Sequence, residues 1–293
     1  ALGNLGRLEE AIASYDQALK IKPDGYEAWN NRGIVLGNLG RLEEAIASYD
    51  QALKIKPDGY EAWNNRGIVL GDLGRLEEAI ASYDQALKIK PDKDEAWLNR
   101  GNALGDLGQL EEAIASYDQA LKIKPDKDEA WNNRGNALGD LGRLEEAIAS
   151  YDQALKIKPD GYEAWFNRGI ALGDLGRLEE AIASYDQALK IKPDDHEAWN
   201  NRGNALGNLG RFEEAIASYD QALKIKLDKE EVWYNKACSY ALEGNIEKAV
   251  ENLQQAINLS PDKCREMSRT DSDFDGIRED ERFQALIQGG SDW

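Results

Sequence analysis

Apolar side chains recur along the chain with the three- and four-residue spacing of amphipathic helices. After Gly25, one set of such positions ends before a glycine-containing segment, and a second set follows it. The first set is Ala28, Trp29, Gly33, Leu36 and Leu39, and the second is Leu42, Ala45, Ile46, Tyr49, Ala52 and Leu53. The pattern predicts two short helices, each with one apolar and one polar face.

Turn and capping residues separate the two predicted helices. Asn38–Gly40 has the composition of a turn, and Glu43 and Glu44 follow it in the first turn of the second helix, where acidic side chains suit the helix dipole. Lys54 lies near the end of that helix, and Pro57 stops it. Because neither helix can bury its apolar face alone, successive pairs must stack to form a continuous core.

The same pair of helices recurs every 34 residues. This interval separates Trp29, Trp63, Trp97, Trp131, Trp165, Trp199 and Trp233, and also Pro23, Pro57, Pro91, Pro125, Pro159 and Pro193. We therefore predict seven units, at 26–59, 60–93, 94–127, 128–161, 162–195, 196–229 and 230–263. Residues 1–25 are assigned to a partial unit, the end of a first helix plus a second helix, and residues 264–293 to a C-terminal cap.

The repeated residues carry a family resemblance. The order Trp29, Gly33, Leu36, Ala45, Tyr49, Ala52 and Pro57 resembles the tetratricopeptide repeat (TPR), which has the same period. The resemblance covers most of the chain and implies an all-α fold, a right-handed α-α superhelix of stacked hairpins.

The chain departs from the family pattern at a few positions. Arginine stands where the family usually has an apolar residue, at Arg32, Arg66, Arg100, Arg134, Arg168 and Arg202. We expect these stems to pack while the guanidinium groups reach water or a carboxylate. The unit from residue 230 is looser, with Ala237 in place of the small glycine and Leu227 in place of the preceding proline.

The last thirty residues do not repeat the pattern. They combine many charges with a few apolar residues, Phe274, Ile277, Phe283, Leu286 and Ile287. This mixture suits a short capping helix that covers the final apolar face and presents a polar face to water. The amino-acid sequence of this segment also resembles the closing part of some TPR arrays.

Composition excludes several classes of partner. The 293 residues include 36 Lys and Arg against 55 Asp and Glu, a formal net charge of −19 that disfavours binding to nucleic acid or to anionic membranes. No apolar stretch or signal peptide stands out, so we expect a soluble, cytoplasmic protein with Cys238 and Cys264 as free thiols. Because Met267 is the only methionine, we also expect the chain to be part of a larger or processed product.

Differences between the repeats carry more information than their likeness. The stretch Leu42–Asp58 also occurs verbatim from Leu8, Leu76, Leu110, Leu144 and Leu178. Packing does not require identical solvent-facing residues each time, so recent duplication or consensus design explains this uniformity. The remaining variation gathers in the first helix of each unit and in the loop before it.

Most of the variable positions share one helical face. When each unit is numbered from 1, positions 1, 5, 9 and 13 follow a four-residue spacing. In TPR proteins the first helices line the concave wall, so the resemblance implies that this stripe faces the ligand; neutral drift at exposed positions is the alternative. The candidates are Asn30, Asn64, Leu98, Asn132, Phe166 and Asn200 at position 5, Asn102, Asn136 and Asn204 at position 9, and Asp72, Asp106, Asp140 and Asp174 at position 13.

An unvarying asparagine lies beside this stripe, at position 6. Its copies, which we call the asparagine ladder, are Asn31, Asn65, Asn99, Asn133, Asn167, Asn201 and Asn235. The ladder resembles the one in superhelical TPR arrays, and a carboxamide can pair with the peptide groups of an extended ligand because it both donates and accepts. Alternatively, these side chains hydrogen-bond neighbouring hairpins or are simply copied with the rest of the repeat.

The charges near the ladder predict an acidic groove. A glutamate precedes each ladder residue by one turn, and the aspartates at position 13 follow two turns later. A concave wall of one sign focuses its potential, so we expect a protein or peptide partner that is basic or neutral. A solvated face is the alternative, and the absence of Lys or Arg from positions 2, 5, 6 and 9 of the units argues against a clamp for acidic C-termini.

Three other motifs are weak candidates. Asp271–Gly276 imitates the first half of a calcium loop, but Arg282 takes the place of the bidentate glutamate. The glycine-containing turns lack the Gly-Lys-Ser/Thr of a phosphate loop, and His196 has no evident nucleophile or base partner. We therefore predict no catalytic residue, no metal and no cofactor.

The leading hypothesis is a non-catalytic scaffold that binds an extended peptide or a partner domain in its concave groove. Two alternatives remain open. One is a spacer or self-assembly module, in which the face exposed at Ala1 stacks end to end with another chain. The other is the recruitment or sensor region of a larger protein with an N-terminal catalytic domain.

Overall fold

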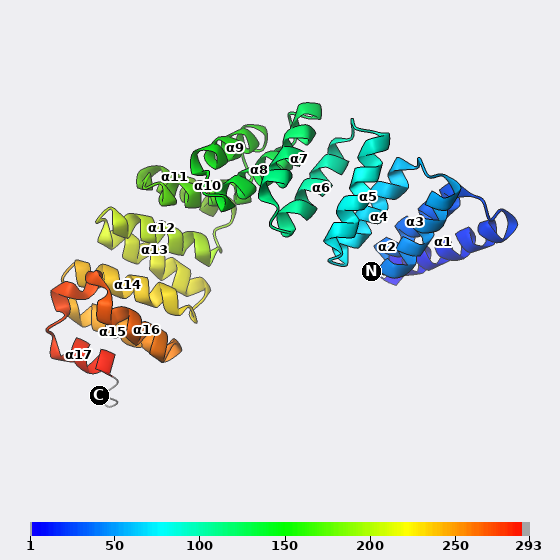
Figure 1. Cartoon of the computed structure of the whole chain (residues 1–293). Helices are drawn as coiled ribbons and strands as arrows, with labels where there is room; N and C mark the ends of the chain where they lie inside the picture. The colour runs from blue at the N-terminus through cyan, green and yellow to red at the C-terminus, as the bar shows by residue number, and fades with distance from the viewer. Residues whose placement is uncertain (1, 289–293) are drawn as a thin grey trace. The chain divides into compact units, whose positions relative to one another are not determined.

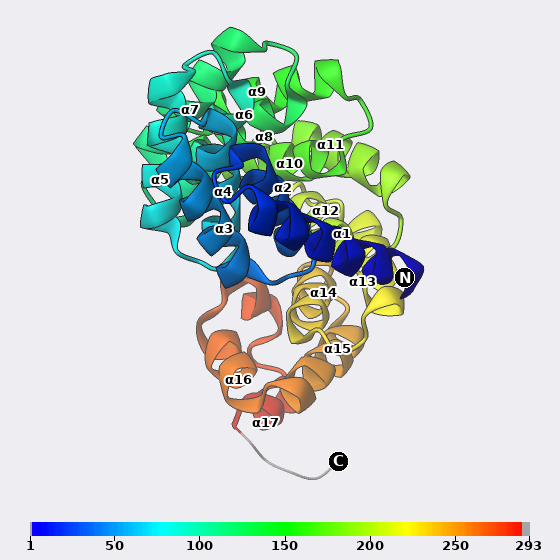
Figure 2. The same cartoon turned by 90° about the vertical axis from the view of Figure 1, so that its right-hand side faces the viewer.

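The computed structural model describes residues 2–288, and they form helices with short connections and no strand (Figure 1). Contacts divide the chain into two compact units, with the division after Glu146. Within each unit, consecutive helices lie side by side (Figures 1 and 2). Ala1 and residues 289–293, which belong to the predicted partial unit and cap, lie outside the described part.

The first unit contains one leading helix and successive hairpins. Its helices are α1 (Leu2–Ile21), α2 (Tyr26–Asn38), α3 (Leu42–Ile55), α4 (Tyr60–Asp72), α5 (Leu76–Ile89), α6 (Asp94–Asp106), α7 (Leu110–Ile123) and α8 (Asp128–Asp140). Helix α9 (Leu144–Ile157) begins just before the division between the units. The paired helices match the two that the apolar pattern predicts in each repeat.

The second unit continues the hairpins and ends in the cap. Its helices are α10 (Tyr162–Asp174), α11 (Leu178–Ile191), α12 (His196–Asn208), α13 (Phe212–Ile225), α14 (Glu230–Leu242), α15 (Ile246–Leu259), α16 (Pro261–Thr270), the 3₁₀ helix η1 (Ser272–Ile277) and α17 (Glu281–Gln288). Among all the described helices, none has the length and apolar character that crossing a bilayer requires.

The turn inside each hairpin is fixed by one glycine. Gly40 has φ +74°, a left-handed conformation that glycine adopts without steric cost. The backbone N–H of Arg41 then donates to the carbonyl of Leu36 at 2.9 Å, which satisfies a carbonyl at the end of α2. The predicted turn at Asn38–Gly40 is confirmed.

The end of the second helix depends only partly on proline. Helix α3 ends at Ile55, and Lys56 before Pro57 leaves the helical region, as the residue before proline prefers. Helix α13 ends at the equivalent Ile225, although Leu227 replaces the proline there. The tryptophan of each hairpin donates its indole N–H, at 2.9 Å, to the carbonyl of the proline six residues earlier. Trp233 makes the same bond to the carbonyl of Leu227, which replaces that proline.

In five hairpins a glycine closely contacts a tyrosine ring, whereas the last hairpin has Ala237 at this position; the glycines are Gly33, Gly67, Gly101, Gly169 and Gly203. The predicted apolar faces are buried, with Leu36, Ala45 and Ala52 wholly enclosed. A Cβ atom on Gly33 would lie 2.6 Å from the Tyr49 ring, so only glycine lets the ring approach. The small residue at this position is therefore required by packing.

The repeated arginines join neighbouring hairpins, as predicted for their stems and guanidinium groups. Arg66 Nε donates to Asp50 Oδ1 of the preceding hairpin at 2.8 Å, and its Nη1 donates to Ser82 Oγ of its own hairpin at 2.7 Å. The guanidinium carbon lies 5.9 Å from the ring centre of Trp63. Each such side chain combines charge pairing, hydrogen bonding and cation–π contact.

In the second unit, the side chain of Asp195 caps the start of α12. Asp195 Oδ1 accepts from the backbone N–H groups of Glu197 at 2.9 Å and Ala198 at 3.0 Å, and Oδ2 accepts from Lys192 Nζ at 2.8 Å. Burial opposes ionisation of this carboxyl, but the bonds from Lys192, Ala198 and Tyr162 outweigh it and lower the pKa of Asp195 to about 2.

The N-terminal segment differs from the expectation of a hairpin fragment. Helix α1 runs without interruption from Leu2 to Ile21, although Gly3–Gly6 has the turn composition of the other repeats. Gly6 is not among the glycines with positive φ.

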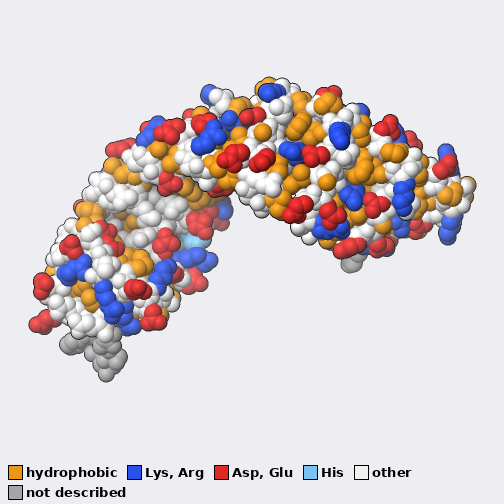
Figure 3. Space-filling model, in the orientation of Figure 1, with side chains coloured by type: hydrophobic (Ala, Val, Ile, Leu, Met, Phe, Trp, Pro, Cys, Tyr) orange, Lys and Arg blue, Asp and Glu red, His pale blue; other side chains and the backbone are white. Residues whose placement is uncertain are grey.

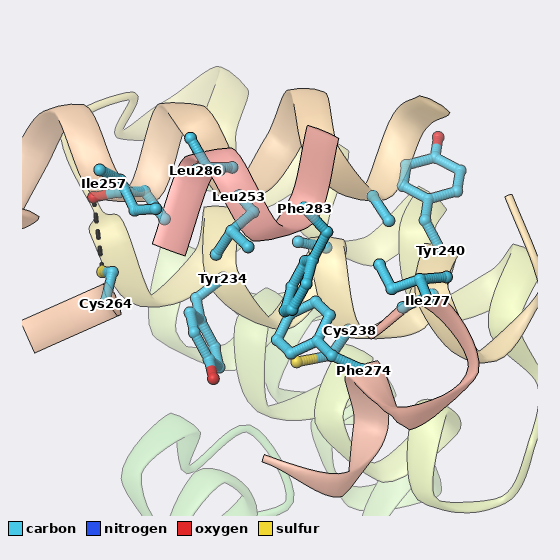
Figure 4. Packing of buried hydrophobic residues seen from close by; sticks show 14 of the residues in the cluster. Tyr234, Cys238, Tyr240, Leu253, Ile257, Cys264, Phe274, Ile277, Phe283 and Leu286 are labelled. Carbon is cyan, nitrogen blue, oxygen red and sulfur yellow. Dashed lines mark hydrogen bonds between the residues drawn. The ribbon is translucent and has the colours of Figure 1, made fainter. Parts of the chain in front are cut away.

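The cap consists of three short helical segments rather than one. It begins at Pro261, three residues before the predicted boundary, because proline is favoured in the first turn of a helix. Phe274 and Phe283 pack together with ring centres 5.2 Å apart, beside Leu253 of α15 (Figure 4). This cluster covers the apolar face of α14 and α15, which is the role predicted for the cap.

Candidate peptide-binding groove

The first helices of successive hairpins contact one another in each unit. In the first unit α2 contacts α4, α4 contacts α6 and α6 contacts α8, and in the second α10 contacts α12 and α12 contacts α14. All of the predicted site residues lie on these helices. The contacts bring position 9 of one hairpin close to position 6 of the next.

Position 5 is less accessible than the stripe predicts. Asn30, Asn200 and Leu98 are buried, and Asn64, Asn132 and Phe166 are half-buried. The Oδ1 atoms of Asn30, Asn64 and Asn132 are enclosed without a hydrogen-bond partner. These residues therefore lie mostly between adjacent hairpins.

Two ladder residues donate to the asparagine at position 9 of the preceding hairpin. In the first unit, Asn133 Nδ2 donates to Asn102 Oδ1 at 3.0 Å, and the Tyr117 hydroxyl donates to the same oxygen at 3.0 Å. The alternative of hydrogen bonding between neighbouring hairpins therefore applies at Asn133.

The second unit repeats this arrangement. Asn204 Oδ1 accepts from Asn235 Nδ2 and from the Tyr219 hydroxyl, each at 2.9 Å. Asn136 at position 9 and Asn167 in the ladder each have an interaction partner as well.

Other ladder residues have no such partner because isoleucine stands at position 9 before them. Ile34, Ile68 and Ile170 are 38%, 40% and 37% exposed. No side-chain hydrogen bond is found within the described residues for the ladder residues that follow them, which are Asn65, Asn99 and Asn201. Asn31 is exposed.

Each unit contains a cavity at the same place in the repeat. The cavity of the first unit has a volume of about 410 Å³ and is lined by Asn102, Asp106, Leu110, Tyr117, Asn133, Asn136 and Asp140, among others. The cavity of the second unit has about 220 Å³ and is lined by Ile170, Asp174, Leu178, Tyr185, Asn201, Asn204 and Asn208, among others. The structure thus places predicted residues of positions 6, 9 and 13 around one cavity.

Aspartates at position 13 are exposed at these cavities and affect the tyrosines beside them. The pKa of Tyr117 is raised by burial and by the charges of Asp106 and Glu129, and that of Tyr185 by burial and by Asp174. On the face shown in Figure 3, acidic side chains are interspersed with lysines and arginines. The negative charge near the tyrosines is therefore a local feature of the cavities.

Comparisons with known proteins identify the repeat. Models of the tetratricopeptide repeat match residues 1–60, 48–81 and 69–108. A further model, described as Cilia and flagella-associated protein 70 C-terminal domain, matches residues 91–270, which is more than half of the chain. The chain belongs to this tetratricopeptide repeat family. No match to a curated protein is found.

Solved structures of other TPR proteins resemble this one. YrrB, described as "a TPR protein with an unusual peptide-binding site", is 25% identical with a TM-score of 0.58, over 64% of this chain and 97% of its own. A TPR protein from Parabacteroides merdae is 19% identical with a TM-score of 0.61, over 90% and 97%. Cut9–Hcn1, a hetero-tetramer of the APC/C, is 16% identical with a TM-score of 0.56, over 96% and 52%. The all-α fold of tandem TPR hairpins is confirmed.

TPR arrays of this family act as protein-interaction scaffolds and are typically non-catalytic. Their stacked hairpins provide extended surfaces that are larger than the pocket of an enzyme. A protein-interaction scaffold is therefore the class to which this chain belongs.

One cluster of potential ligand atoms was missed in the sequence. Cys238, Asp271 and Asp273 bring their side-chain atoms within 4.8 Å of one another. The Asp271 carboxylate already accepts from the Tyr234 hydroxyl at 2.8 Å, from Cys238 Sγ at 3.8 Å and from the backbone N–H of Asp273 at 3.0 Å. This carboxylate thus caps η1 and ties the cap of the TPR array to α14. In the calcium-like segment, Asp275 pairs with Arg278 at 2.7 Å.

Proposed function

We propose that this TPR array binds an extended, basic or neutral peptide segment of a partner protein along the first helices of its hairpins. The observation that carries the proposal is the recurrence of one cavity, lined by ladder, position 9 and position 13 residues, in both units. Amides beside carboxylates are suited to hold peptide groups and to attract cationic side chains.

Two further observations support this function. The resemblance to YrrB, a TPR protein with a peptide-binding site, favours a peptide ligand. Exposed Ile170 lines one cavity with Asn201, whose carboxamide makes no side-chain hydrogen bond within the described residues, so apolar surface and an available amide lie together there. Such a mixture of apolar and polar groups is typical of surfaces that bind peptides with moderate affinity.

A peptide array tests the proposal. Arrayed ten-residue peptides of basic, neutral and acidic composition are incubated with the purified chain, and the strongest peptide is titrated in solution at several salt concentrations. We expect basic or neutral peptides to bind, and the affinity of the basic peptides to fall as salt rises, because exposed charges are screened. Binding of acidic peptides alone, or binding of a basic peptide that salt does not weaken, would contradict the charge assignment.

Matched charge variants locate the binding surface. Asp72→Asn, Asp106→Asn and Asp174→Asn together remove three groove charges. Glu77→Gln, Glu111→Gln and Glu179→Gln remove three charges from exposed positions on the second helices. The first set should weaken binding of the peptide and the second should not. Equal effects of the two sets would place binding outside the groove.

A further inference from the structure

The clefts between adjacent hairpins are of two kinds, according to the residue at position 9. With asparagine there, the hydrogen-bonding groups of the cleft satisfy one another, and we call the cleft closed in this sense alone, since the first unit's cavity of about 410 Å³ lies beside them. Asn102 Oδ1 accepts from both Asn133 and Tyr117. With isoleucine there, the cleft is open, because a hydrocarbon side chain cannot accept a hydrogen bond. The residue at position 9 thus determines whether the tyrosine and the ladder asparagine, which are the same in every cleft, have a hydrogen-bond acceptor.

In a closed cleft the polar groups satisfy each other. A carboxamide oxygen has two lone pairs, and in Asn204 both are used, by Asn235 and by the Tyr219 hydroxyl. The equivalent distances in the two units agree within 0.1 Å. A peptide that approached Asn133 or Asn235 would have to break an existing bond to gain a new one.

In an open cleft the same groups lack protein partners. Asn99, the ladder residue of the hairpin after Ile68, is half-buried, and neither its carboxamide nor the Tyr83 hydroxyl makes a side-chain hydrogen bond within the described residues. Asn201, Tyr185 and Ile170 repeat this in the second unit, where all three line the cavity. Polar groups in this state bind water, which a peptide group can replace without losing a protein–protein bond.

We propose that the residue at position 9 is a switch that determines which residues of the asparagine ladder are available to hydrogen-bond a peptide. This inference rests on the proposed function. The open clefts hold the peptide backbone at Asn65, Asn99 and Asn201, and the closed clefts at Asn133 and Asn235 serve the fold. Position 9 is therefore a specificity-determining position that acts through the ladder residue of the next hairpin.

The open clefts also indicate what they bind. In the cleft of Asn99, the exposed Ile68 and Asp72 lie one turn apart on α4, and Ile170 and Asp174 lie in the same way on α10. A lysine or arginine side chain suits this pair, because its apolar stem can cover the isoleucine while its charge approaches the carboxylate. The preferred peptide thus has an extended backbone with basic side chains at the open clefts.

The switch is tested first without any peptide, by urea unfolding of a double-mutant cycle. Asn133→Ala should raise the equilibrium constant of unfolding about fivefold in the wild-type background, because it removes the hydrogen bond from Asn133 and leaves one lone pair of Asn102 Oδ1 without a donor. With Asn102→Ile already present, Asn133→Ala should have no further effect. Asn99→Ala is the matched control and should be silent by itself. An absence of coupling between Asn102 and Asn133 would overturn the switch.

Binding is then measured with a fluorescein-labelled copy of the strongest peptide from the array. Asn99→Ala should weaken its binding about fivefold, as expected for one lost hydrogen bond, whereas Asn133→Ala should leave the dissociation constant unchanged. Ile68→Asn closes the cleft with a residue that the chain itself uses at this position. It should weaken binding to a similar degree and make Asn99→Ala silent.

The outcomes separate the two proposals. If no arrayed peptide binds, the proposed function fails and the assignment of available ladder residues fails with it, whereas the hydrogen-bond switch is still decided by the stability cycle. If a peptide binds and Asn99→Ala and Asn133→Ala weaken it equally, the groove assignment survives and the switch is refuted.

Discussion

Two glycines of one helix should respond in opposite ways to the same substitution. Gly67 and Gly71 both lie in α4, one turn apart. A Cβ atom on Gly67 would lie 2.5 Å from Cε1, 2.8 Å from Cδ1 and 2.9 Å from Cζ of Tyr83, whereas one on Gly71 would meet nothing within 4 Å. We predict that Gly67→Ala destabilises the first unit and that Gly71→Ala stabilises it.

The magnitudes follow from these distances. Tyr83 is only 4% exposed, so its ring cannot move aside without displacing other core residues. Overpacking of this kind costs about 1–3 kcal/mol, which exceeds the gain of about 0.5–1 kcal/mol that alanine brings to a helix interior. At Gly71 only the gain applies. The two variants should therefore differ in stability by roughly 2 kcal/mol.

The assay has to be local because repeat arrays can unfold in parts. Hydrogen exchange of the amides in α4 and α5 reports the opening free energy of this hairpin, and urea unfolding reports that of the chain. Faster exchange in Gly67→Ala and slower exchange in Gly71→Ala are expected. If Gly67→Ala protected these amides as Gly71→Ala does, the close contact with Tyr83 would not govern the packing of the hairpin.

Three further outcomes are expected. Asp195→Ala should lower the free energy of unfolding by about 1 kcal/mol at pH 7. The pKa of Asp195 in the folded chain lies below its unfolded value near 3.9, so protonation removes the stabilisation. Urea unfolding should therefore show the difference between the variant and the wild type vanish as the pH falls from about 4 to 2. Lys93→Asp places the same kind of cap before α6, where Lys93 already has extended backbone angles, and should raise the thermal midpoint by stabilising the chain by about 0.5–1 kcal/mol; a lower midpoint would show that its cation–π contact matters more. Burial raises the pKa of both the Cys238 and Cys264 thiols, so mass spectrometry should find neither alkylated by iodoacetamide at pH 8 until urea unfolds the chain, and rapid labelling of the native protein would contradict their burial.

Most helix boundaries could be predicted because their signals are local. The turn glycine, the acidic first turn and the proline lie within a few residues of the boundary that each one sets, and α3 begins and ends where Leu42 and Pro57 indicate. The stacking followed from apolar faces that neither helix can bury alone, and the family resemblance added the superhelix. At α1 the same composition, in Gly3–Gly6, predicts a turn, but the helix runs without interruption from Leu2 to Ile21.

The candidate site could be predicted only in part, because it depends on contacts between hairpins. The stripe and the ladder were located from their spacing, but their burial follows from how adjacent first helices pack. The bond between Asn102 and Asn133 joins residues 31 positions apart, and that between Cys238 and Asp271 joins residues 33 apart. A sequence signal for the first pair existed, since asparagine at position 9 alternates with isoleucine while the ladder residue stays the same.

The division of labour between the two helices explains why this chain can vary its groove without losing its fold. Asp50 and Ser82, which hold Arg66 between two hairpins, belong to the stretch that is repeated verbatim on the second helices. Variation at positions 5, 9 and 13 leaves these bonds intact because it lies on the first helices. Position 9 is the exception, because it changes the hydrogen bonding of the repeated tyrosine and of the ladder asparagine. With asparagine at position 9 these two groups stabilise the fold, and with isoleucine they are available to bind a peptide. Diversity at position 9 should therefore change both properties together, and in opposite directions.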